Sequence, residues 1–243
     1  MTAMVLLSGW GIDARIWQPL APCWPAGMEI RTPDWPGYGE RRGETHPASL
    51  PELASLMRDA LPADAVWVGW SLGGLLAGAL LAHLPPPRAL VLIGTAARFC
   101  HAGGVSAAEL DTFRRAFERE PQATWQHFLR WQLQGEPTPR TAHRRLLDLI
   151  GSRPSASTLT LETGLHQLAE IDLTPWLAAP LCPIRRVAGT QDGLLSEAAR
   201  RSADLVLPDT GHCPMLSCPA ALTAYLAQLR AEVAADDKHE AAT

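Results

Sequence analysis

The chain has 243 residues, of which 47% are hydrophobic and 19% are charged, and its formal net charge is −4. This size suits one α/β domain with an insertion. The mildly acidic balance argues against a nucleic-acid-binding protein, and no run reaches the ~18 apolar residues that a membrane span needs. The N-terminus lacks a signal-peptide pattern, and the five cysteines are scattered, so we expect a cytoplasmic protein without disulfides, metal or cofactor.

Short apolar runs alternate with longer helical patterns, which is typical of a parallel sheet wrapped by helices. Strands are predicted at 4–7, 29–32, 66–68, 90–93, 184–187 and 205–207. A capping box from Ser49 to Glu52 predicts a helix that ends near Leu61. The helix after residue 71 must end before Pro85, because proline cannot continue it.

The alternation stops between the strands at 90–93 and 184–187, where the pattern is helical and rich in aromatic residues. We interpret residues 98–177 as an inserted helical lid, because it leaves the sheet on the side where ligands bind in such folds. Residues 1–97 and 178–230 then form the core. Residues 231–243 lose apolar periodicity and are expected to be a flexible tail.

A Gly-x-Ser-x-Gly pattern at 69–73 lies between the strand at 66–68 and an apolar helix. On such a turn the serine hydroxyl points out of the sheet edge, and the glycines let strand and helix approach closely. The free N–H groups at the start of the helix face the same point. We therefore predict that Ser71 is a nucleophile.

A serine nucleophile needs a general base and an acid that orients the base. With this type of turn, the acid and then the base follow later strands. His212 lies in the loop after the last strand and is the predicted base, whereas the other seven histidines lie elsewhere. Asp192, after the strand at 184–187, is the predicted acid. Asp209, three residues from His212, and Asp172, with no strand before it, are the alternatives.

The oxyanion that forms during the reaction needs two backbone N–H donors. Leu72, directly after the nucleophile, is one predicted donor. Trp10, in the loop after the first strand, is the other. The Trp10 indole is expected to line the site, to pack in the core, or to do both.

Several segments resemble the pimeloyl-[acyl-carrier protein] methyl ester esterases of biotin synthesis, which are α/β-hydrolases. They are 69–75 (Gly-Trp-Ser-Leu-Gly-Gly-Leu), 9–11 (Gly-Trp-Gly), 34–39 (Asp-Trp-Pro-Gly-Tyr-Gly), 192–194 (Asp-Gly-Leu), 211–212 (Gly-His) and 128–132 (Phe-Leu-Arg-Trp-Gln). The resemblance covers nearly the whole chain. It implies an α/β-hydrolase fold with a mainly parallel sheet of about six strands and a helical lid. The chain would begin at the third strand of that fold, without the N-terminal antiparallel edge hairpin.

The resemblance also implies a substrate, the methyl ester of pimeloyl-acyl carrier protein, and a serine esterase mechanism. In the lid segment the family's phenylalanine and glutamine border the acyl pocket. The expected substrate-binding residues are Trp10, Ser71, Leu72, Phe128, Leu129, Arg130, Trp131, Gln132 and His212. The expected partner is the carrier protein, and we expect the enzyme itself to be a monomer.

An acidic carrier protein needs a basic docking face. Residues 98–153 contain nine arginines against six acidic residues, so this part of the chain is near +3. Arg140 and Arg144 stand one helical turn apart and match basic positions of the family's lid. A solvated arginine face explains them equally well.

The chain departs from the family pattern at two further points. Ser8 replaces the histidine that the family carries before Gly-Trp-Gly, which affects the support of the oxyanion loop. The short spacing from Asp192 to His212 implies a trimmed helix between the last two strands. Two other functions stay open: a hydrolase of a small ester or C–C bond that needs no carrier protein, and a non-catalytic binding protein. The intact serine, acid and histidine argue against the second.

Overall fold

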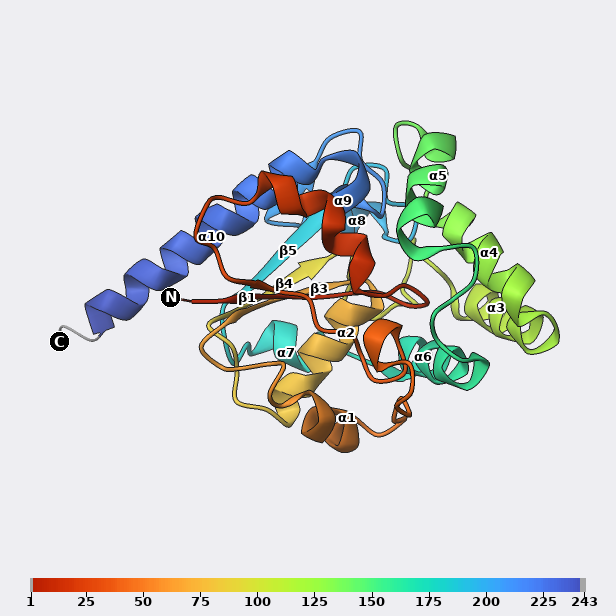
Figure 1. Ribbon diagram of the computed structural model, residues 1–243, viewed down its shortest axis with the longest axis horizontal. Helices are drawn as coiled ribbons and strands as arrows, with labels where there is room; N and C mark the ends of the chain where they lie inside the picture. Colours follow the sequence, from red (N-terminus) through yellow and green to blue (C-terminus); the bar gives the residue numbers. More distant parts are fainter. Residues whose placement is uncertain (1, 241–243) are drawn as a thin grey trace.

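The computed structural model describes residues 2–240 and is built around a six-stranded sheet (Figure 1). All neighbouring strands pair in parallel, in the order β2-β1-β3-β4-β5-β6. The strands are β1 (Met4–Leu7), β2 (Ile30–Arg31), β3 (Val66–Trp70), β4 (Ala89–Ile93), β5 (Ile184–Gly189) and β6 (Leu205–Leu207). The predicted parallel α/β architecture is therefore confirmed. The central strands β3 and β4 are buried along their whole length, which explains their continuous apolar runs.

Helices cover both faces of this sheet. Three lie on one face, α1 (Leu50–Met57), α2 (Leu72–Ala79) and α7 (Thr174–Ala178), while the 3-10 helix η1 (Ala14–Cys23) and α10 (Pro219–Glu240) lie on the other (Figure 1). The remaining short elements are the 3-10 helices η2 (Gly39–Arg41) and η3 (Leu80–Ala82), α8 (Glu197–Arg201) and α9 (Pro214–Ser217). The five-residue α8 matches the trimmed helix that the sequence implied.

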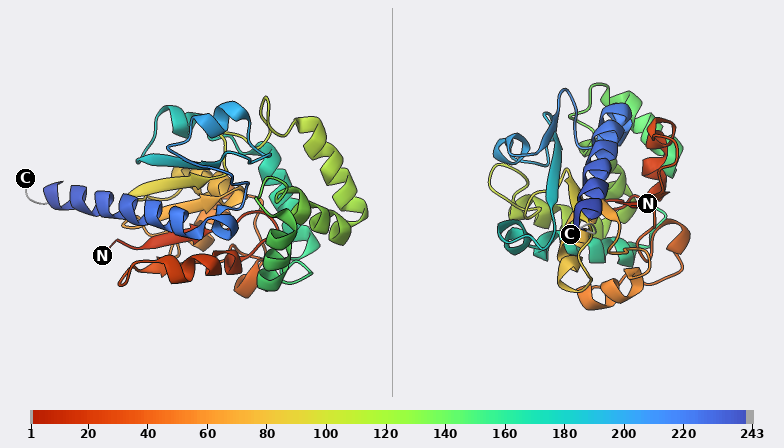
Figure 2. Two further views of the ribbon diagram at one scale, coloured as in Figure 1. Left: turned by 90° about the horizontal axis from the view of Figure 1, so that it is seen from above. Right: turned by 90° about the vertical axis from the view of Figure 1, so that its left-hand side faces the viewer.

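Four further helices between β4 and β5 gather beyond one end of the sheet (Figures 1 and 2). They are α3 (Ala107–Arg119), α4 (Pro121–Trp131), α5 (Pro139–Ile150) and α6 (Thr158–Glu170). This end is the one at which the parallel strands finish, so the loops that follow β1, β3, β4, β5 and β6 all meet beneath these helices. We refer to residues 98–177 as the lid segment.

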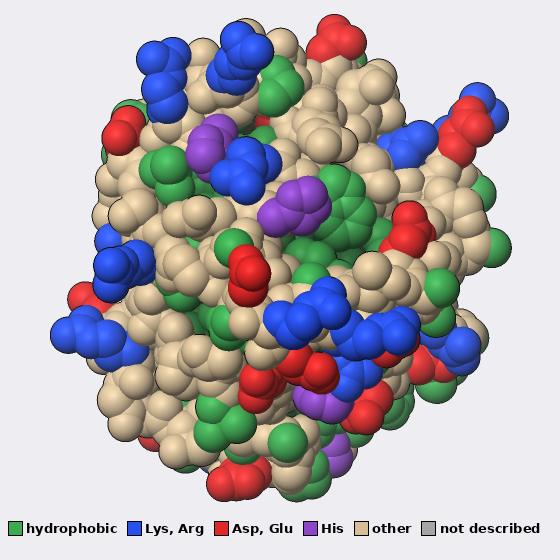
Figure 3. Space-filling model, turned by 90° about the vertical axis from the view of Figure 1, so that its right-hand side faces the viewer, with side chains coloured by type: hydrophobic (Ala, Val, Ile, Leu, Met, Phe, Trp, Pro, Cys, Tyr) green, Lys and Arg blue, Asp and Glu red, His purple; other side chains and the backbone are tan. Residues whose placement is uncertain are grey.

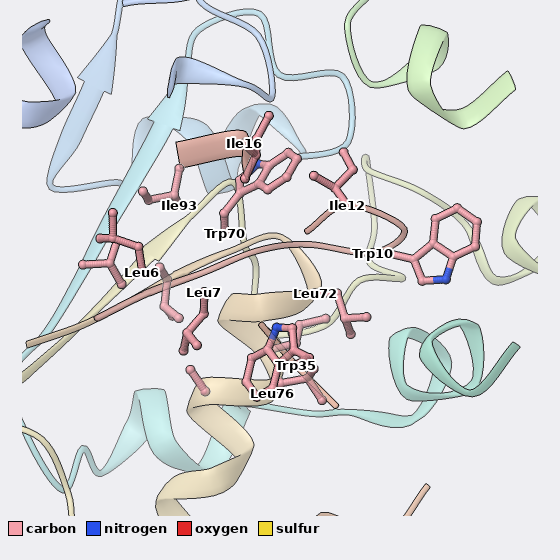
Figure 4. Packing of buried hydrophobic residues seen from close by; sticks show 14 of the residues in the cluster. Leu6, Leu7, Trp10, Ile12, Ile16, Trp35, Trp70, Leu72, Leu76 and Ile93 are labelled. Atoms are coloured by element: carbon pink, nitrogen blue, oxygen red, sulfur yellow. The ribbon is translucent and has the colours of Figure 1, made fainter. Parts of the chain in front are cut away.

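The core beneath the lid segment is dominated by tryptophan and aliphatic side chains. Trp35, Trp67 and Trp70 are each at most 1% exposed. Leu6, Leu7, Leu76 and Ile93 pack between the sheet and its helices (Figure 4). Trp10 points away from this group toward the lid segment, so its side chain joins the sheet domain to the lid.

Some predicted boundaries differ from the observed ones. The second strand is only two residues long, because it is an edge strand and Pro33 cannot donate to a ladder. The helix that starts at Leu50 ends at Met57, short of the predicted Leu61. The segment predicted as a flexible tail continues α10 as far as Glu240, and alanine-rich sequence favours helix there. Residues 241–243 lie outside the described part of the chain.

Candidate active site

Ser71 lies at the sharp turn between β3 and α2, and the local glycines explain how the turn closes. Its backbone has φ +56° and ψ −124°, a conformation that costs a non-glycine residue about 1–3 kcal/mol and is typical of functional sites. A Cβ on Gly69 would lie 2.5 Å from the Cα of Gly74, and one on Gly73 would lie 2.4 Å from the carbonyl oxygen of Ser8. Only glycine at both positions allows helix α2 to begin this close to the sheet.

His212 and Asp192 form a buried hydrogen-bonded pair at the ends of β6 and β5. The Nδ1–H of His212 donates to Asp192 Oδ2 over 2.8 Å, and the two residues are 2% and 0% exposed. Asp192 Oδ1 accepts the backbone N–H of Leu194 over 3.0 Å. Because the carboxylate only accepts, it holds the proton on Nδ1 and leaves a lone pair on Nε2.

Gly94, directly after β4, brings this pair next to Ser71. A Cβ on Gly94 would lie 2.9 Å from the His212 ring and 3.2 Å from Asp192 Oδ2, and Gly94 and Ser71 line the same cavity of about 10 Å³. His212 Nε2 is buried and has no hydrogen-bond partner within the described residues. Ser71 Oγ is therefore not hydrogen-bonded to it in this conformation. Such contacts in enzymes often tighten only when substrate is present.

The structure separates the three aspartates considered as the acid. Asp192 contacts His212, whereas Asp209 is exposed and has φ +49° in the turn before the histidine loop. Asp172 forms an ion pair with Arg98 over 2.5 Å, and this partner holds the pKa of Asp172 below its usual range.

The two predicted oxyanion donors belong to segments that lie next to Ser71. Leu72 is the first residue of α2, and a Cβ on Gly9, beside Trp10, would lie 3.1 Å from the Cβ of Ser71. No described acceptor takes the backbone N–H of Trp10 or Leu72. The Ser8 hydroxyl is buried and has no hydrogen-bond partner among the described residues, but the Ser8 carbonyl accepts the Trp35 indole N–H over 3.0 Å. Trp35 therefore supports the oxyanion loop where the sequence lacks the family's histidine.

The Trp10 indole is 1% exposed and is held by the lid segment. Its Nε1–H donates to the Leu161 carbonyl on α6 over 2.8 Å. Its ring meets Phe128 edge to face, with centroids 5.1 Å apart, and meets Phe113 and Phe117 at 5.7 Å each. Trp10 therefore packs in a core and also lines a small apolar cavity under the lid, so both interpretations of its indole describe its position.

The predicted lid residues fall on different sides of α4. Phe128 and Trp131 line the apolar cavity together with Trp10, while Leu129 and Gln132 are buried outside its lining. Both amide atoms of Gln132 lack hydrogen-bond partners within the described residues. Arg130 is exposed on the outer side of the helix. The last four residues of α4, 128–131, already span a full helical turn and cannot share one face, so the contiguous segment could not all line one pocket.

Three residues that the sequence analysis gave no role support this site. The Trp70 indole N–H donates to the His212 carbonyl over 2.7 Å, and the Thr95 hydroxyl donates to the Ser71 carbonyl over 3.1 Å. Glu136, from the turn after α4, accepts the Cys213 backbone N–H over 2.7 Å. Thr95 follows a predicted strand and could have been found by that position. Glu136 carried no sequence signal, since its contact lies 77 residues away.

Arg140 and Arg144 lie on α5 and are exposed. Neither has a carboxylate within ion-pair distance among residues 2–240, whereas Arg98 and Arg115 in the same segment are paired. Basic and acidic side chains both occur on the lid side of the molecule, around hydrophobic and histidine side chains (Figure 3). In the described part of the chain, no helix is long and apolar enough to cross a membrane, and no three potential ligands are placed to hold a metal ion.

Comparisons with known proteins agree with this geometry. A family model described as "Alpha/beta hydrolase family" matches residues 4–224. A pimeloyl-[acyl-carrier protein] methyl ester esterase from Photobacterium profundum is 35% identical over 229 residues, covering 89% of each chain. One of the same name from Edwardsiella ictaluri is 34% identical, over 93% of this chain and 92% of that protein. Among solved structures, a thermophilic esterase from Thermogutta terrifontis has a TM-score of 0.75 at 23% identity, over 96% of this chain and 90% of that one.

Proposed function

This chain belongs to the alpha/beta hydrolase family, and we propose that it is the carboxylesterase that hydrolyses the methyl ester of pimeloyl-acyl carrier protein in biotin synthesis. The proposed substrate rests on the sequence identity of 35% to an esterase of that name over 89% of both chains. The buried His212–Asp192 pair beside the strained Ser71 supports the chemistry.

In the proposed mechanism, Ser71 Oγ attacks the carbonyl carbon of the methyl ester, and its proton passes to Nε2 of His212. Asp192 stabilises the imidazolium that forms. The proton then goes to the methoxy oxygen as the C–O bond breaks, and methanol leaves. A water molecule attacks the acyl-Ser71 ester, again with His212 as base, and releases the carboxylic acid with Ser71 restored.

The backbone N–H groups of Leu72 and Trp10 would hold the oxyanion of both tetrahedral intermediates. Neither donates to another acceptor in the described structure, so no existing hydrogen bond has to break before it can donate. One such donor is typically worth about 10²–10³-fold in kcat, because it is already oriented when the charge develops.

The acyl chain would lie among the aromatic residues between Trp10 and α4. The cavity there is about 10 Å³, which is room for about one water molecule. A seven-carbon acyl chain is far larger, so its entry requires α3 and α4 to move apart or the side chains of Phe113 and Trp131 to rotate. The lid segment would thus control access to Ser71.

The exposed Arg140 and Arg144 are the proposed contacts for the acidic carrier protein. They stand one turn apart on α5, and Arg140 borders a hollow of about 340 Å³ at the start of the helix. Since neither is neutralised by a carboxylate among the described residues, both are available to a partner's acidic side chains.

A growth experiment tests this function. The gene should restore growth without biotin to a bacterial strain that lacks its own pimeloyl-ester esterase, whereas the Ser71→Ala variant should not. In purified enzyme the same variant should lose roughly 10³-fold or more of its activity on a short ester, because the triad acts as a unit. Ser55→Ala, on the exposed side of α1, is the matched control and should behave as wild type.

Two outcomes would contradict the proposal in different ways. Near-wild-type turnover by a folded Ser71→Ala protein would refute the nucleophile. Failure to restore growth, with good hydrolysis of short esters, would instead favour an enzyme that acts on a small ester without a carrier protein.

A further inference from the structure

Glu136 is a buried carboxylate with an unusual set of neighbours. It is 4% exposed, and no cation is within ion-pair distance of it in the part of the chain that the structure describes. Its Oε1 accepts the Cys213 backbone N–H over 2.7 Å, and its Oε2 is buried with no hydrogen-bond partner from the described residues. A buried carboxylate without a cation is costly to keep, and groups of this kind concentrate at functional sites.

The turn that carries Glu136 is pressed against both loops of the catalytic pair. A Cβ on Gly211 would lie 2.8 Å from Glu136 Oε1, and a Cβ on Gly135 would lie 1.8 Å from the carbonyl oxygen of Gln191. Gln191 precedes Asp192, and Gly211 precedes His212. The turn therefore touches the acid loop and the base loop at the residue next to each catalytic side chain.

A second hydrogen bond joins the lid segment to the same histidine loop. Arg145 on α5 donates to the Leu216 carbonyl on α9 over 2.9 Å. Together with the hydrogen bond from Cys213 to Glu136, it attaches residues 213–216, which follow His212 in the chain, to the lid segment. The Trp70 indole fixes the carbonyl of His212 itself from the sheet side.

We propose that Glu136 is a positioning residue of this active site: its carboxylate fixes the His212 loop and places a negative charge beside the imidazole that takes up a proton during catalysis. A neutral side chain could make the same hydrogen bond to Cys213, so the presence of an acidic group here needs an explanation. The charge favours imidazolium, the state that exists just after Ser71 loses its proton. The inference rests on the proposed role of His212 as base.

Several titratable or charged groups near His212 can affect the pH dependence of the activity. Asp192 contacts the ring from the β5 loop, Glu136 from the lid turn contacts the backbone of Cys213 next to it, and the Cys213 thiol follows in the chain. Burial raises the pKa of Cys213, with Glu136 and Asp192 as further negative neighbours, so this thiol stays neutral near pH 7. The Arg200 guanidinium donates to the Asp192 carbonyl behind the pair. Only the Glu136 charge is removed in the test.

The test compares kcat/KM for p-nitrophenyl butyrate from pH 5 to pH 9 in the wild type and in Glu136→Gln. The glutamine can still accept the Cys213 N–H, but it carries no charge. His212 should then lose its proton more readily, so the midpoint of the acid limb should move to lower pH by roughly half a unit or more. Glu136→Thr is a second uncharged variant with less bulk, in case the glutamine protein does not fold.

Glu118→Gln, on the exposed surface of α3, is the matched loss of charge and should leave the midpoint unchanged. A midpoint that moves by less than roughly half a unit in a folded, uncharged Glu136 variant overturns the inference, whatever its plateau rate. So does a shift of the same size in Glu118→Gln. Ser71→Ala run in parallel separates the two proposals, since residual activity there would refute the nucleophile rather than the role of Glu136.

Discussion

In the candidate site, side chains from other segments of the chain bind the backbone carbonyls of key residues. Thr95 binds the carbonyl of Ser71, Trp70 binds the carbonyl of His212, and Trp35 binds the carbonyl of Ser8. Because these carbonyls are fixed, the backbone of each loop is held in place. The side chains of the site are therefore attached to a rigid backbone. This matters because errors of about 1 Å in such contacts cost large factors in rate.

The acid of the triad gives a prediction at this scale. Asp192→Asn should lower kcat by roughly 10³–10⁴-fold, because the amide can donate to Nδ1 and favour the wrong tautomer of His212. Asp209→Asn removes an exposed carboxylate that does not touch His212, so it should leave kcat within a factor of about two. Hydrolysis of a short ester measures both. The reverse ranking of the two variants would show that Asp192 is not the acid.

At the scale of elements, the lid helix α6 is attached to the sheet domain by a buried polar contact. His46 is 4% exposed; its Nδ1 lies 2.9 Å from the Pro36 carbonyl and its Nε2 lies 3.0 Å from Gln167 Oε1. The Gln167 amide donates to the Pro47 carbonyl over 3.1 Å. Together with Trp10 and Leu161, this contact fixes α6. Helix α4 is attached as well, because the Trp125 indole N–H donates to the Gly11 carbonyl over 2.8 Å. Helix α3 instead meets Trp10 through the rings of Phe113 and Phe117, which can separate at lower cost.

His46 gives the fold a pH dependence with a definite sign. Burial lowers its pKa below the usual 6.5, so the unfolded chain binds a proton more readily than the folded chain does. The free energy of unfolding should therefore fall as the pH drops through 6.5. His46→Gln should lose part of this fall. Urea unfolding at pH 7.5 and pH 5.5 measures it.

The exposed His83→Gln serves as the control for that experiment and should keep the wild-type pH dependence. If His46→Gln and wild type lose the same free energy between the two pH values, His46 does not contribute to the acid sensitivity of the fold.

For the whole molecule, the proposed docking of the carrier protein depends on how charge is distributed over the lid. The chain is −4 overall and the lid segment as a whole is neutral, but residues 98–153 within it are near +3, so an acidic partner would be attracted to that part of the lid. The lid also lies over the mouth of the site, because the lid segment leaves the sheet after β4 and returns to β5. A carrier protein on α5 would therefore deliver its acyl chain within reach of Ser71.

Charge reversal tests this arrangement. Arg140→Glu combined with Arg144→Glu should lower kcat/KM for pimeloyl-acyl carrier protein methyl ester by roughly tenfold or more, and added salt should narrow the difference. Hydrolysis of a short ester should be unchanged. Arg58→Glu, at the exposed C-terminal end of α1, is the control and should affect neither substrate. An equal loss on both substrates would mean that the arginines support the lid rather than bind a partner.

Local sequence was enough for much of this protein. The strand and helix order, the parallel sheet and the turn at Ser71 depend on apolar periodicity and on glycines at fixed spacing, which act between neighbouring residues. The order of Ser71, Asp192 and His212 along the chain made them candidates, since residues after parallel strands meet at one edge of the sheet. The length of α10 was missed because alanine favours helix without any apolar periodicity.

Tertiary structure alone decided what depends on contacts between distant segments. Whether Asp192 or Asp209 reaches His212 follows from the directions of two loops, and the sequence pattern allowed either. The packing of four lid helices on the sheet decides three further features. They are the small size of the cavity beside Phe128, the exposure of Arg130 and the contact of Glu136 with Cys213. Such packing is set by the shapes of many side chains together, so no short stretch of sequence contains it.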